Sequence, residues 1–502
     1  MDIPSLFMIP SAVSSGKVHS VFPNSTDADF DFNRDSSATR VNSQGLIETV
    51  GYFGSELVTN GDFSSGSSGW TLSTTPPELR GNSFLFNSSS NFIFRSWSNV
   101  SGRTYRINFQ GTGNVRYRTG FSGSDGTIKA ISLPTIVEFE ATSNTNRIQI
   151  YGATSGTGVL DSVSIKEVTG DRARLNYEIE GGLVNTKPSL LLENQSTNLV
   201  TYSEDFSQWS LGANGFLTYE KDIVAPDGTL GVYRLKLPAT GTTYLLSNTF
   251  SSSNPLTVSV FAKATGTGND NFNLYTGGSN VSPLKTATDE WQKFEYTASG
   301  NSFYIINSGD SFVSDIYIWG AQAEALSYCT SYIPTNGSTQ TRAAETCNGA
   351  GTSSIFESSE GILYAEIAAL ANSTNYRVIS ISDGTTSNVV RFYYSPTANR
   401  VGVNLRSNSA NVFSIANLSI TNALEFIKIA VSYKLNNFKI YINGTQVQSY
   451  TSGNIPIGLN ELAFDNGAGN DVFYGKIRDI RVYNTKEMTD SEVDILLTKI
   501  TS

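Results

Sequence analysis

Leu57 to Trp70 reads LVTNGDFSSGSSGW, and Leu199 to Trp209 reads LVTYSEDFSQW. Each phrase opens a long stretch that is rich in Ser, Thr, Asn and Gly. Each stretch closes on an acid followed by alternating apolar residues, Asp161-Ser-Val-Ser-Ile165 in the first and Asp315-Ile-Tyr-Ile-Trp319 in the second. A repeat of this length indicates duplicated domains rather than a short-period solenoid. The sequence therefore predicts a string of similar β-modules.

The composition narrows the class of protein. At 502 residues the chain is too long for one hydrophobic core, so we expect three or four domains. Only 16% of the residues are charged and 44 are Gly, which favours short strands and polar turns over helices. The formal net charge is −10 without a basic cluster, so we expect no nucleic acid partner. No apolar run approaches the roughly 18 residues of a membrane span, so we expect no membrane insertion.

Strand patterns recur inside both repeats. Tyr105, Ile107 and Phe109 alternate with polar residues in the first, and Val258 and Val260 do so in the second. A half-buried antiparallel strand needs that period of two. Three tryptophans stand at positions that we expect to be buried in cores, namely Trp70, Trp209 and Trp319.

From Ile355 the pattern restarts with a different sequence. Asn443-Gly444 follows alternating apolar residues and predicts a hairpin turn. Thr489 and Glu492 have the spacing of a capping box, and apolar residues follow at helical intervals, at Val493, Leu496, Leu497 and Ile500. We therefore expect one short C-terminal helix, packed on the last sandwich or on a neighbouring subunit.

Three long phrases carry a resemblance to a known class of protein. They are DFDFNRDSSATRVNSQGLIE (Asp29–Glu48), PSLLLENQSTNLVTYSEDFSQW (Pro188–Trp209) and WGAQAEALSYCTSYIPTNGSTQTRAAE (Trp319–Glu345). They resemble modular bacteriophage virion proteins of the tail-fibre, adhesin or head-fibre-like kind. The resemblance implies a place in the virion, an extracellular particle whose proteins are synthesised in the host cytoplasm. It also implies that the chain contacts other virion proteins and that it assembles as a homotrimer.

The modules carry resemblances of their own. The LVTNGDF…GW opening resembles that of carbohydrate-binding modules of the galactose-binding-like jelly-roll type. The C-terminal phrases KIAVSYKLNNFKIYING (Lys428–Gly444) and GKIRDIRVYNTKEMT (Gly475–Thr489) resemble a laminin-G or concanavalin-A-like sandwich. The expected fold class is therefore all-β and multidomain, with two jelly-roll β-sandwiches, a concanavalin-A-like sandwich and a short C-terminal helix.

The order of the phrases predicts an inserted domain. In the proteins that this chain resembles, the ATRVN…GLIE phrase runs soon into the RLNY…PSLLLE phrase, whereas here the whole first repeat separates them. We expect a discontinuous N-terminal virion-anchoring unit at 1–54 and 169–197, with the first jelly roll inserted at 55–168. The second jelly roll is expected at 198–327, an irregular linker at 328–353, and the concanavalin-A-like domain with its helix at 354–502.

Catalytic chemistry has few candidates. His19 is the only histidine and stands beside no nucleophile motif, so we expect no Ser-His-Asp or Cys-His site. A glycoside hydrolase needs two carboxylates a few ångströms apart. The best acids lack the tight alternating spacing of such a pair; they are Glu357, Glu360, Glu366, Asp465 and Asp471. We therefore expect no enzyme, and a polysaccharide depolymerase is the least favoured hypothesis.

An acidic run near the N-terminus is the candidate cation site. Asp27, Asp29 and Asp31 lie on one face if the chain is extended, where like charges repel and invite a structural Ca²⁺ or a nearby arginine. The alternative, which we favour, is a solvated acidic face with Phe30 and Phe32 turned inward. Phe32 stands where an EF-hand needs Gly, so that motif is absent. We expect no other cofactor.

The two cysteines leave a choice open. Cys329 and Cys347 flank a connector rich in Pro, Gly and Thr. They form a disulfide if the particle meets an oxidising environment, and otherwise they stay as two thiols.

Sugar binding needs exposed aromatic faces, because a pyranose stacks its C–H face on a ring while its hydroxyls bond outward. The candidate ligand-binding residues are Trp97 and Tyr117 in the first repeat, Tyr275 and Trp291 in the second, and Tyr394 in the third. Tyr393 and Tyr394 fall on opposite faces of one strand, so at most one of them is exposed.

The leading functional hypothesis is a non-enzymatic phage fibre or adhesin that binds host-surface polysaccharide. Several weak sites on one particle would act together to give useful avidity. The alternative is a capsid decoration or head-fibre protein with a purely structural, protein-binding role.

Overall fold

The computed structural model describes residues 3–14, 16–34, 36–50, 53–101, 103–119, 128–141, 145–168, 173–180, 183–239, 243–251, 253–307, 312–372 and 375–502. Antiparallel strands dominate these residues, so the prediction of an all-β fold is confirmed. The chain divides into two compact units. One combines Met1–Val50 with Asp171–Ser502, and the other is Gly51–Gly170.

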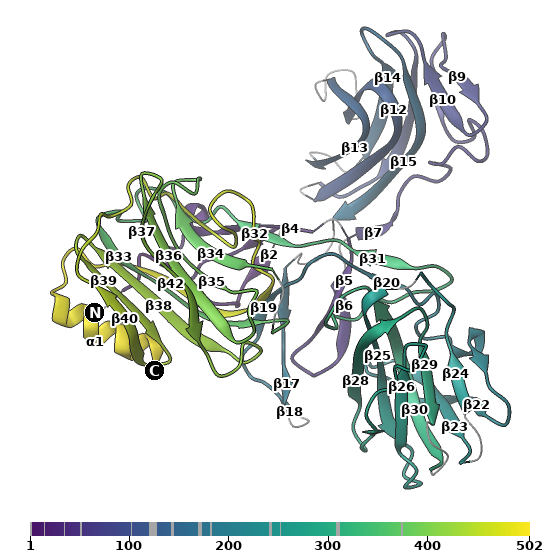
Figure 1. Cartoon of the computed structure of the whole chain (residues 1–502). Helices are drawn as coiled ribbons and strands as arrows, with labels where there is room; N and C mark the ends of the chain where they lie inside the picture. The colour runs from purple at the N-terminus through teal and green to yellow at the C-terminus, as the bar shows by residue number, and fades with distance from the viewer. Residues whose placement is uncertain are drawn as a thin grey trace. The chain divides into compact units, whose positions relative to one another are not determined.

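The unit at 51–170 is built around one long strand. β12 (Thr104–Thr119) pairs with β13 (Lys129–Glu140) along its length, with β15 (Gly158–Val168) along its first part and with β14 (Thr145–Gly152) along its last. The sheet is completed by β7 (Phe53–Glu56), β8 (Thr71–Leu72), β9 (Glu78–Arg80), β10 (Ser83–Phe86) and β11 (Phe92–Ser98). Tyr105, Ile107 and Phe109 lie in its core, as their alternation predicts. Figure 1 labels β12 to β15 in this unit.

The second repeat forms a two-sheet sandwich. One sheet has the order β22 (Phe216–Val224), β23 (Leu230–Leu237), β30 (Ser314–Glu324), β25 (Ser253–Ala264), β28 (Gln292–Gly300). The other has the order β21 (Ser210–Leu211), β24 (Thr243–Leu246), β29 (Tyr304–Asn307), β26 (Asn271–Tyr275), β27 (Lys285–Thr286). Val258 and Val260 from the first sheet and Leu274 and Ile305 from the second share one core, so the predicted inward face of β25 is confirmed.

The C-terminal part forms a second sandwich. One sheet has the order β37 (Ala410–Ser419), β36 (Arg400–Ser407), β35 (Val389–Tyr394), β34 (Arg377–Ser382), β41 (Glu461–Ala463). The facing sheet contains β42 (Gly475–Asn484), β33 (Glu360–Ala369), β38 (Ile427–Lys434), β39 (Asn437–Ile442) and β40 (Thr445–Tyr450). Asn443 and Gly444 form the β39–β40 turn with φ of 45° and 78°, which confirms the predicted hairpin.

Segments from the N-terminal half complete this C-terminal sandwich. β1 (Leu6–Met8) pairs with β42, and β19 (Ser189–Leu192) joins β42 to β16 (Arg174–Asn176). Residues of β1, β4 (Phe30–Asn33) and β19 belong to the same core cluster as the C-terminal strands. These segments therefore bury their apolar faces against the C-terminal domain.

Short elements connect the larger sheets. β2 (Val13–Ser14), β3 (Lys17–Val18), β4 and β32 (Thr346–Asn348) form one small sheet, and β20 (Ser196–Asn198) pairs with β31 (Gln340–Arg342). β5 (Ala38–Val41) pairs with β6 (Ile47–Val50), and β17 (Ile179–Glu180) with β18 (Leu183–Val184). Two 3-10 turns, η1 (Thr26–Ala28) and η2 (Phe206–Gln208), complete the inventory. The connector at 328–353 thus contributes β31 and β32 to two of these small sheets.

The C-terminal helix α1 (Asp490–Thr501) begins with the predicted capping box between Thr489 and Glu492. Leu496, Leu497 and Ile500 pack against Ile362, Tyr364 and other outward residues of the β33–β38–β39 sheet. Figure 1 shows α1 beside β39 and β40. Of the two partners that the sequence left open, the structure shows the sandwich. No helix in the described part of the chain is long and apolar enough to cross a membrane.

The repeated phrase builds the same local structure twice. In the first copy the indole Nε1 of Trp70 donates to the carbonyl oxygen of Asn60 at 3.0 Å, and its ring lies 5.5 Å from that of Phe63. In the second, Nε1 of Trp209 donates to the carbonyl oxygen of Tyr202 at 2.9 Å, and its ring lies 4.9 Å from that of Phe206. These rings are buried, as predicted for the two tryptophans.

The acid of each phrase caps the same turn. The Oδ1 atom of Asp62 accepts from the backbone N–H and hydroxyl of Ser64, and Oδ1 of Asp205 accepts both from Ser207. The acid, the Phe and the Trp of the phrase all make contacts within their own module. The phrase therefore has a structural role in each module.

Candidate functional site

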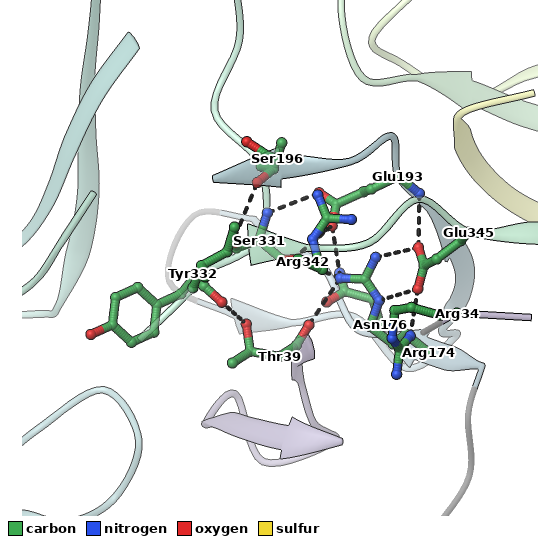
Figure 2. Close-up of polar contacts among 12 residues, drawn as sticks. Arg34, Thr39, Arg174, Asn176, Glu193, Ser196, Ser331, Tyr332, Arg342 and Glu345 are labelled. Carbon is green, nitrogen blue, oxygen red and sulfur yellow. Dashed lines mark hydrogen bonds and ion pairs between the residues drawn. The ribbon is translucent and has the colours of Figure 1, made fainter. Parts of the chain in front are cut away.

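A cluster of five charged side chains lies at the centre of the larger unit. Arg34 follows β4, Arg174 begins β16, Glu193 follows β19, Arg342 ends β31, and Glu345 precedes β32. We call these residues the buried ion cluster, because each is at most 2% exposed. Figure 2 shows their side chains converging from these separate strands. Residues that are far apart in sequence are thereby held at one point.

Arg174 and Glu345 form the centre of the buried ion cluster. Arg174 donates from Nε to Oε1 of Glu345 at 2.9 Å, and its Nη2 donates to Oε2 of the same carboxylate. Nη1 of Arg174 also lies 2.7 Å from Oε2 of Glu193. Arg34 donates from Nη1 to Glu345 at 2.5 Å. This is the bidentate geometry that makes an arginine–carboxylate pair strong.

Neutral groups complete the hydrogen bonding. Ser331 donates its backbone N–H and its hydroxyl to Glu193 at 2.8 and 2.6 Å, and the N–H of Glu193 donates to Glu345 at 2.8 Å. Thr39 accepts from Arg174 through its carbonyl and donates its hydroxyl to the carbonyl of Tyr332 (Figure 2). A buried charge is tolerated when such partners replace its water.

The electrostatics keep the buried ion cluster charged. Burial alone would raise the pKa of Glu193, but the charges of Arg342 and Arg174 and the hydrogen bonds from Ser331 lower it below the ordinary value. Burial also opposes ionisation of Glu345, and Arg174 and Arg34 outweigh it, so that pKa is lowered too. For Arg174, burial disfavours the cation while Glu345 and Glu193 together raise the pKa. The cluster has a structural role, since its members are sealed from solvent.

An open cleft of about 940 Å³ lies beside the buried ion cluster. Its lining includes Thr39, Glu193, Ser331 and Tyr332. It also includes Trp291, which directly precedes β28 of the second-repeat sandwich. We call it the Trp291 cleft.

The Trp291 cleft combines an aromatic ring with polar groups. Trp291 is partly buried, and its Nε1 donates to the carbonyl of Val224 at 2.8 Å, which fixes the indole. Asp289 and Glu290 are exposed at the rim. Lys476 and Glu178 also line the cleft and pair with each other at 2.6 Å. An aromatic surface among carboxylates and an ammonium matches the needs of a saccharide.

The other predicted ligand-binding residues lie elsewhere. Trp97 and Tyr117 are 5% exposed and belong to the core of the 51–170 unit. Tyr394 is fully buried and donates its hydroxyl to the carbonyl of Ile367 at 3.1 Å, so its ring is unavailable to a ligand. Tyr275 is partly buried against Tyr304 and donates to the carbonyl of Gly278. Of the five predicted residues, all of which the structure describes, Trp291 lines the cleft of about 940 Å³.

The predicted cation ligands are engaged separately. Asp29 is buried and accepts from Ser20 N–H at 2.8 Å, with Nδ1 of His19 2.8 Å from its other oxygen. Asp31 pairs with Lys17 at 2.5 Å, and Asp27 lies in η1. Phe30 and Phe32 turn inward, as the favoured alternative predicts. Within the described residues no three acidic, His or Cys side chains come together as a metal site.

The acids considered for hydrolysis are likewise occupied. Glu357 accepts from the N–H and hydroxyl of Ser359, and Asp465 accepts from Gly467 N–H and from Asn348. Glu366 lies 3.8 Å from Arg478, and Asp471 accepts from Asn466. Cys329 and Cys347 are free thiols in this structure.

The buried ion cluster was not predicted from the sequence. A signal was present, because Glu193 directly follows the apolar run Leu190-Leu-Leu. A charge inside an apolar run indicates a buried partner. The identity of that partner depends on tertiary structure, since Arg34 and Glu345 are 311 residues apart.

The fold of the C-terminal sandwich has a family match. Residues 364–494 match the family model described as the Concanavalin A-like lectin/glucanases superfamily. The C-terminal sandwich is therefore a concanavalin-A-like domain, as expected from its phrases. A comparison with curated protein sequences gives no match.

Solved structures are similar to parts of the chain. Domain 4 of the Geobacillus stearothermophilus extracellular arabinanase, in complex with arabinotriose, is 12% identical with a TM-score of 0.26, over 32% of this chain and 73% of that one. The CBM40 module of the Ruminococcus gnavus IT-sialidase, bound to α2,3-sialyllactose, is 15% identical with a TM-score of 0.24, over 28% and 83%. The tandem CBM22 modules of Paenibacillus barcinonensis Xyn10C are 10% identical with a TM-score of 0.21, over 55% and 99%.

Proposed function

We propose that this protein is a non-enzymatic bacteriophage virion protein, a fibre or adhesin that binds host-surface polysaccharide. The observation that carries the glycan part is the Trp291 cleft, where a fixed indole stands among exposed acids. The concanavalin-A-like domain supports the same class of ligand. The phage part is supported by the three virion-like phrases, each of which supplies at least one residue of the buried ion cluster, namely Arg34, Glu193 and Glu345.

In this mechanism each site binds its glycan weakly, and the presence of several sites raises the avidity. The ring of Trp291 supplies a stacking surface, while Asp289 and Glu290 accept hydrogen bonds from sugar hydroxyls. A single open site of this kind binds weakly, and several copies on a homotrimer or on one particle raise the avidity. No covalent step is required.

The buried ion cluster supports this function by holding the cleft walls. Thr39 and Ser331 hydrogen-bond to members of the cluster, and Thr39 also donates to the carbonyl of Tyr332. All three residues line the Trp291 cleft. Walls that are fixed before binding lose less conformational entropy when the ligand arrives. The buried ion cluster therefore contributes to binding by fixing the cleft walls.

Glycan-array binding by the full-length protein tests the proposal, with adsorption of phage particles to host cells as the biological measurement. An adhesin binds a defined set of glycans, and the free protein competes with adsorption. Loss of particle assembly with normal adsorption, on removal of the protein, would instead support the structural decoration role. Shortened polysaccharide chains in a mass spectrum would identify a depolymerase.

A further inference from the structure

One face of the sheet in the 51–170 unit carries arginines and aromatic rings on three adjacent strands. β12 pairs with β14, and β14 pairs with β11 (Figure 1). The residues on the core side of these strands include Ile93, Tyr117 and Ile150. The period of two therefore turns their neighbours to the outer face. We call these outward residues the arginine–aromatic face; they are Phe92, Phe94, Arg116, Arg118, Arg147 and Tyr151.

The rings of the arginine–aromatic face form a row that the guanidinium groups cover in part. The ring centre of Phe92 lies 5.6 Å from that of Tyr151 and 6.4 Å from that of Phe94. The guanidinium of Arg147 lies 4.8 Å from the ring centre of Phe94. All three rings are partly exposed, and the described core of the unit does not include them. They are therefore available to a ligand that lies across the sheet.

Neutral groups fix the arginines in place. Arg116 donates to the carbonyls of Gly152 and Ser89 at 2.8 and 2.9 Å. Arg118 donates from Nε and Nη2 to the side-chain oxygen of Gln149 at 3.2 and 2.9 Å. Because these acceptors carry no charge, they orient each guanidinium without cancelling its positive charge.

The remaining donors of the three arginines are open to solvent. Arg116, Arg118 and Arg147 are all partly exposed. The Nη1 atoms of Arg116 and Arg118 and both terminal nitrogens of Arg147 have no hydrogen-bond partner in the described ranges, and they are not buried. Arg103 of the same unit differs, since it pairs with Glu167 at 2.7 Å. A ligand in solution can therefore reach four unused donors on this face.

Along the described strands no acid lies opposite any of these arginines. Their cross-strand partners are Ala130 and Tyr151 for Arg116, Gln149 for Arg118, and Ser96 for Arg147. Burial raises the pKa of Tyr151, and the charges of the three arginines oppose that rise, which shows that their fields meet at this ring. The face is thus a local concentration of positive charge in a chain of formal net charge −10. Charge complementarity favours an anionic partner.

The spacing favours an extended anion that is built of rings. Arg116 and Arg118 are two residues apart on β12, which separates them by about 7 Å. Arg147 is the diagonal neighbour of Arg118 on β14, at a distance of about 7–8 Å. A chain of acidic sugars can place carboxylates on the guanidiniums and pyranose faces on the rings between them. A single-stranded nucleic acid has a charge on every unit and needs a longer basic groove.

We propose that the arginine–aromatic face binds the acidic residues of a polysaccharide, with carboxylates on the terminal nitrogens of Arg118 and Arg147 and sugar rings against Phe94 and Tyr151. This site lies in a different unit from the Trp291 cleft and does not depend on it. It adds a selectivity for negative charge that the cleft, with exposed acids at its rim, does not provide.

Isothermal titration calorimetry on the full chain tests the proposal with an oligogalacturonate, its methyl ester and an oligothymidylate. We expect the oligogalacturonate to bind at least about tenfold more tightly than the ester, in which the same rings are uncharged. The affinity should fall as salt is added. The double variant Arg118→Gln/Arg147→Gln should bind acid and ester equally. Arg103→Gln, which removes an arginine already paired with Glu167, is the matched control and should bind as wild type does.

Chemical modification of the wild type gives a measurement that needs no variant. Phenylglyoxal modifies accessible arginines, and mass spectrometry locates the modified residues. The oligogalacturonate should protect Arg116, Arg118 and Arg147, while Arg103 should react equally with and without it. Circular dichroism confirms that the variants used for calorimetry are folded.

Four outcomes would overturn the proposal. They are no preference for the acid over the ester, oligothymidylate binding as tight as oligogalacturonate, an unchanged preference in the folded double variant, and protection that is no greater at the three arginines than at Arg103. Trp291→Ala separates this proposal from the proposed function, because it should leave the preference for the acid intact. Loss of oligogalacturonate binding in Trp291→Ala would place the acidic sugar in the cleft and contradict the proposal.

Discussion

Glu345 shows at the scale of one residue how this molecule is held together. Its carboxylate accepts from Arg34, from two nitrogens of Arg174 and from the backbone N–H of Glu193, while it is 0% exposed. Two cations thus depend on one acid. If the acid is neutralised, both remain buried with too little compensation, and a buried unpaired charge is among the most destabilising changes.

Replacing Glu345 by Gln should therefore lower the free energy of unfolding by about 3–5 kcal/mol. The control is Asp31→Asn, which breaks the exposed pair with Lys17 and should change it by less than about 1 kcal/mol. Urea unfolding followed by tryptophan fluorescence measures both. Equal stabilities of the two variants would show that the buried ion cluster does not hold the unit together.

The same carboxylates predict a dependence of stability on acid. The pKa values of Glu193 and Glu345 are lowered in the folded protein from an ordinary value of 4.5, so the unfolded chain takes up protons first as the pH falls. Their contribution is complete above about pH 5 and is lost as the pH falls below the ordinary value. The difference in unfolding free energy between wild type and Glu345→Gln should shrink from pH 7 to pH 3. A difference that is constant over this range would contradict the assignment.

At the scale of elements, local signals were sufficient where an element depends on its own residues. The capping box of α1 and the Asn443-Gly444 turn lie at the predicted residues because each is decided within four positions of the chain. The strand partners of β42 were not predictable in the same way. β1 and β19 join it from far away in sequence, and period-two alternation says which face is buried but not which strand is the neighbour.

The capping box gives a prediction for α1 alone. Thr489→Ala removes the side-chain acceptor for Glu492 N–H and should destabilise the helix by about 1 kcal/mol. Thr498→Ala is the control, because Thr498 is exposed and lies inside the helix. Hydrogen exchange of the α1 amides should be faster in the first variant than in the second. Identical exchange would mean that packing on Tyr364 and Leu497 alone fixes the helix start.

For the molecule as a whole, the sequence predicted the repeated modules, the all-β fold and one residue of the candidate cleft. The repeat was visible because its Phe and Trp are needed in both cores, at Phe63, Trp70, Phe206 and Trp209. Trp291 was singled out with four other aromatic residues, and sequence could not separate it from the buried Trp97 and Tyr394. The exposure of Trp291 on the cleft wall depends on how separate sheets pack together. The residue pattern of one strand does not contain that information.

The central claim is that the Trp291 cleft binds host-surface glycans. The most direct measurement is a glycan array probed with wild-type protein, Trp291→Ala, and the control Phe216→Ala, which removes an aromatic ring that is 64% exposed on the same sandwich. Circular dichroism confirms that each variant is folded. Binding of a defined glycan set by wild type and Phe216→Ala, with at least about a tenfold loss in Trp291→Ala, is the predicted result. No glycan binding by the folded wild type, or undiminished binding by Trp291→Ala, would contradict it.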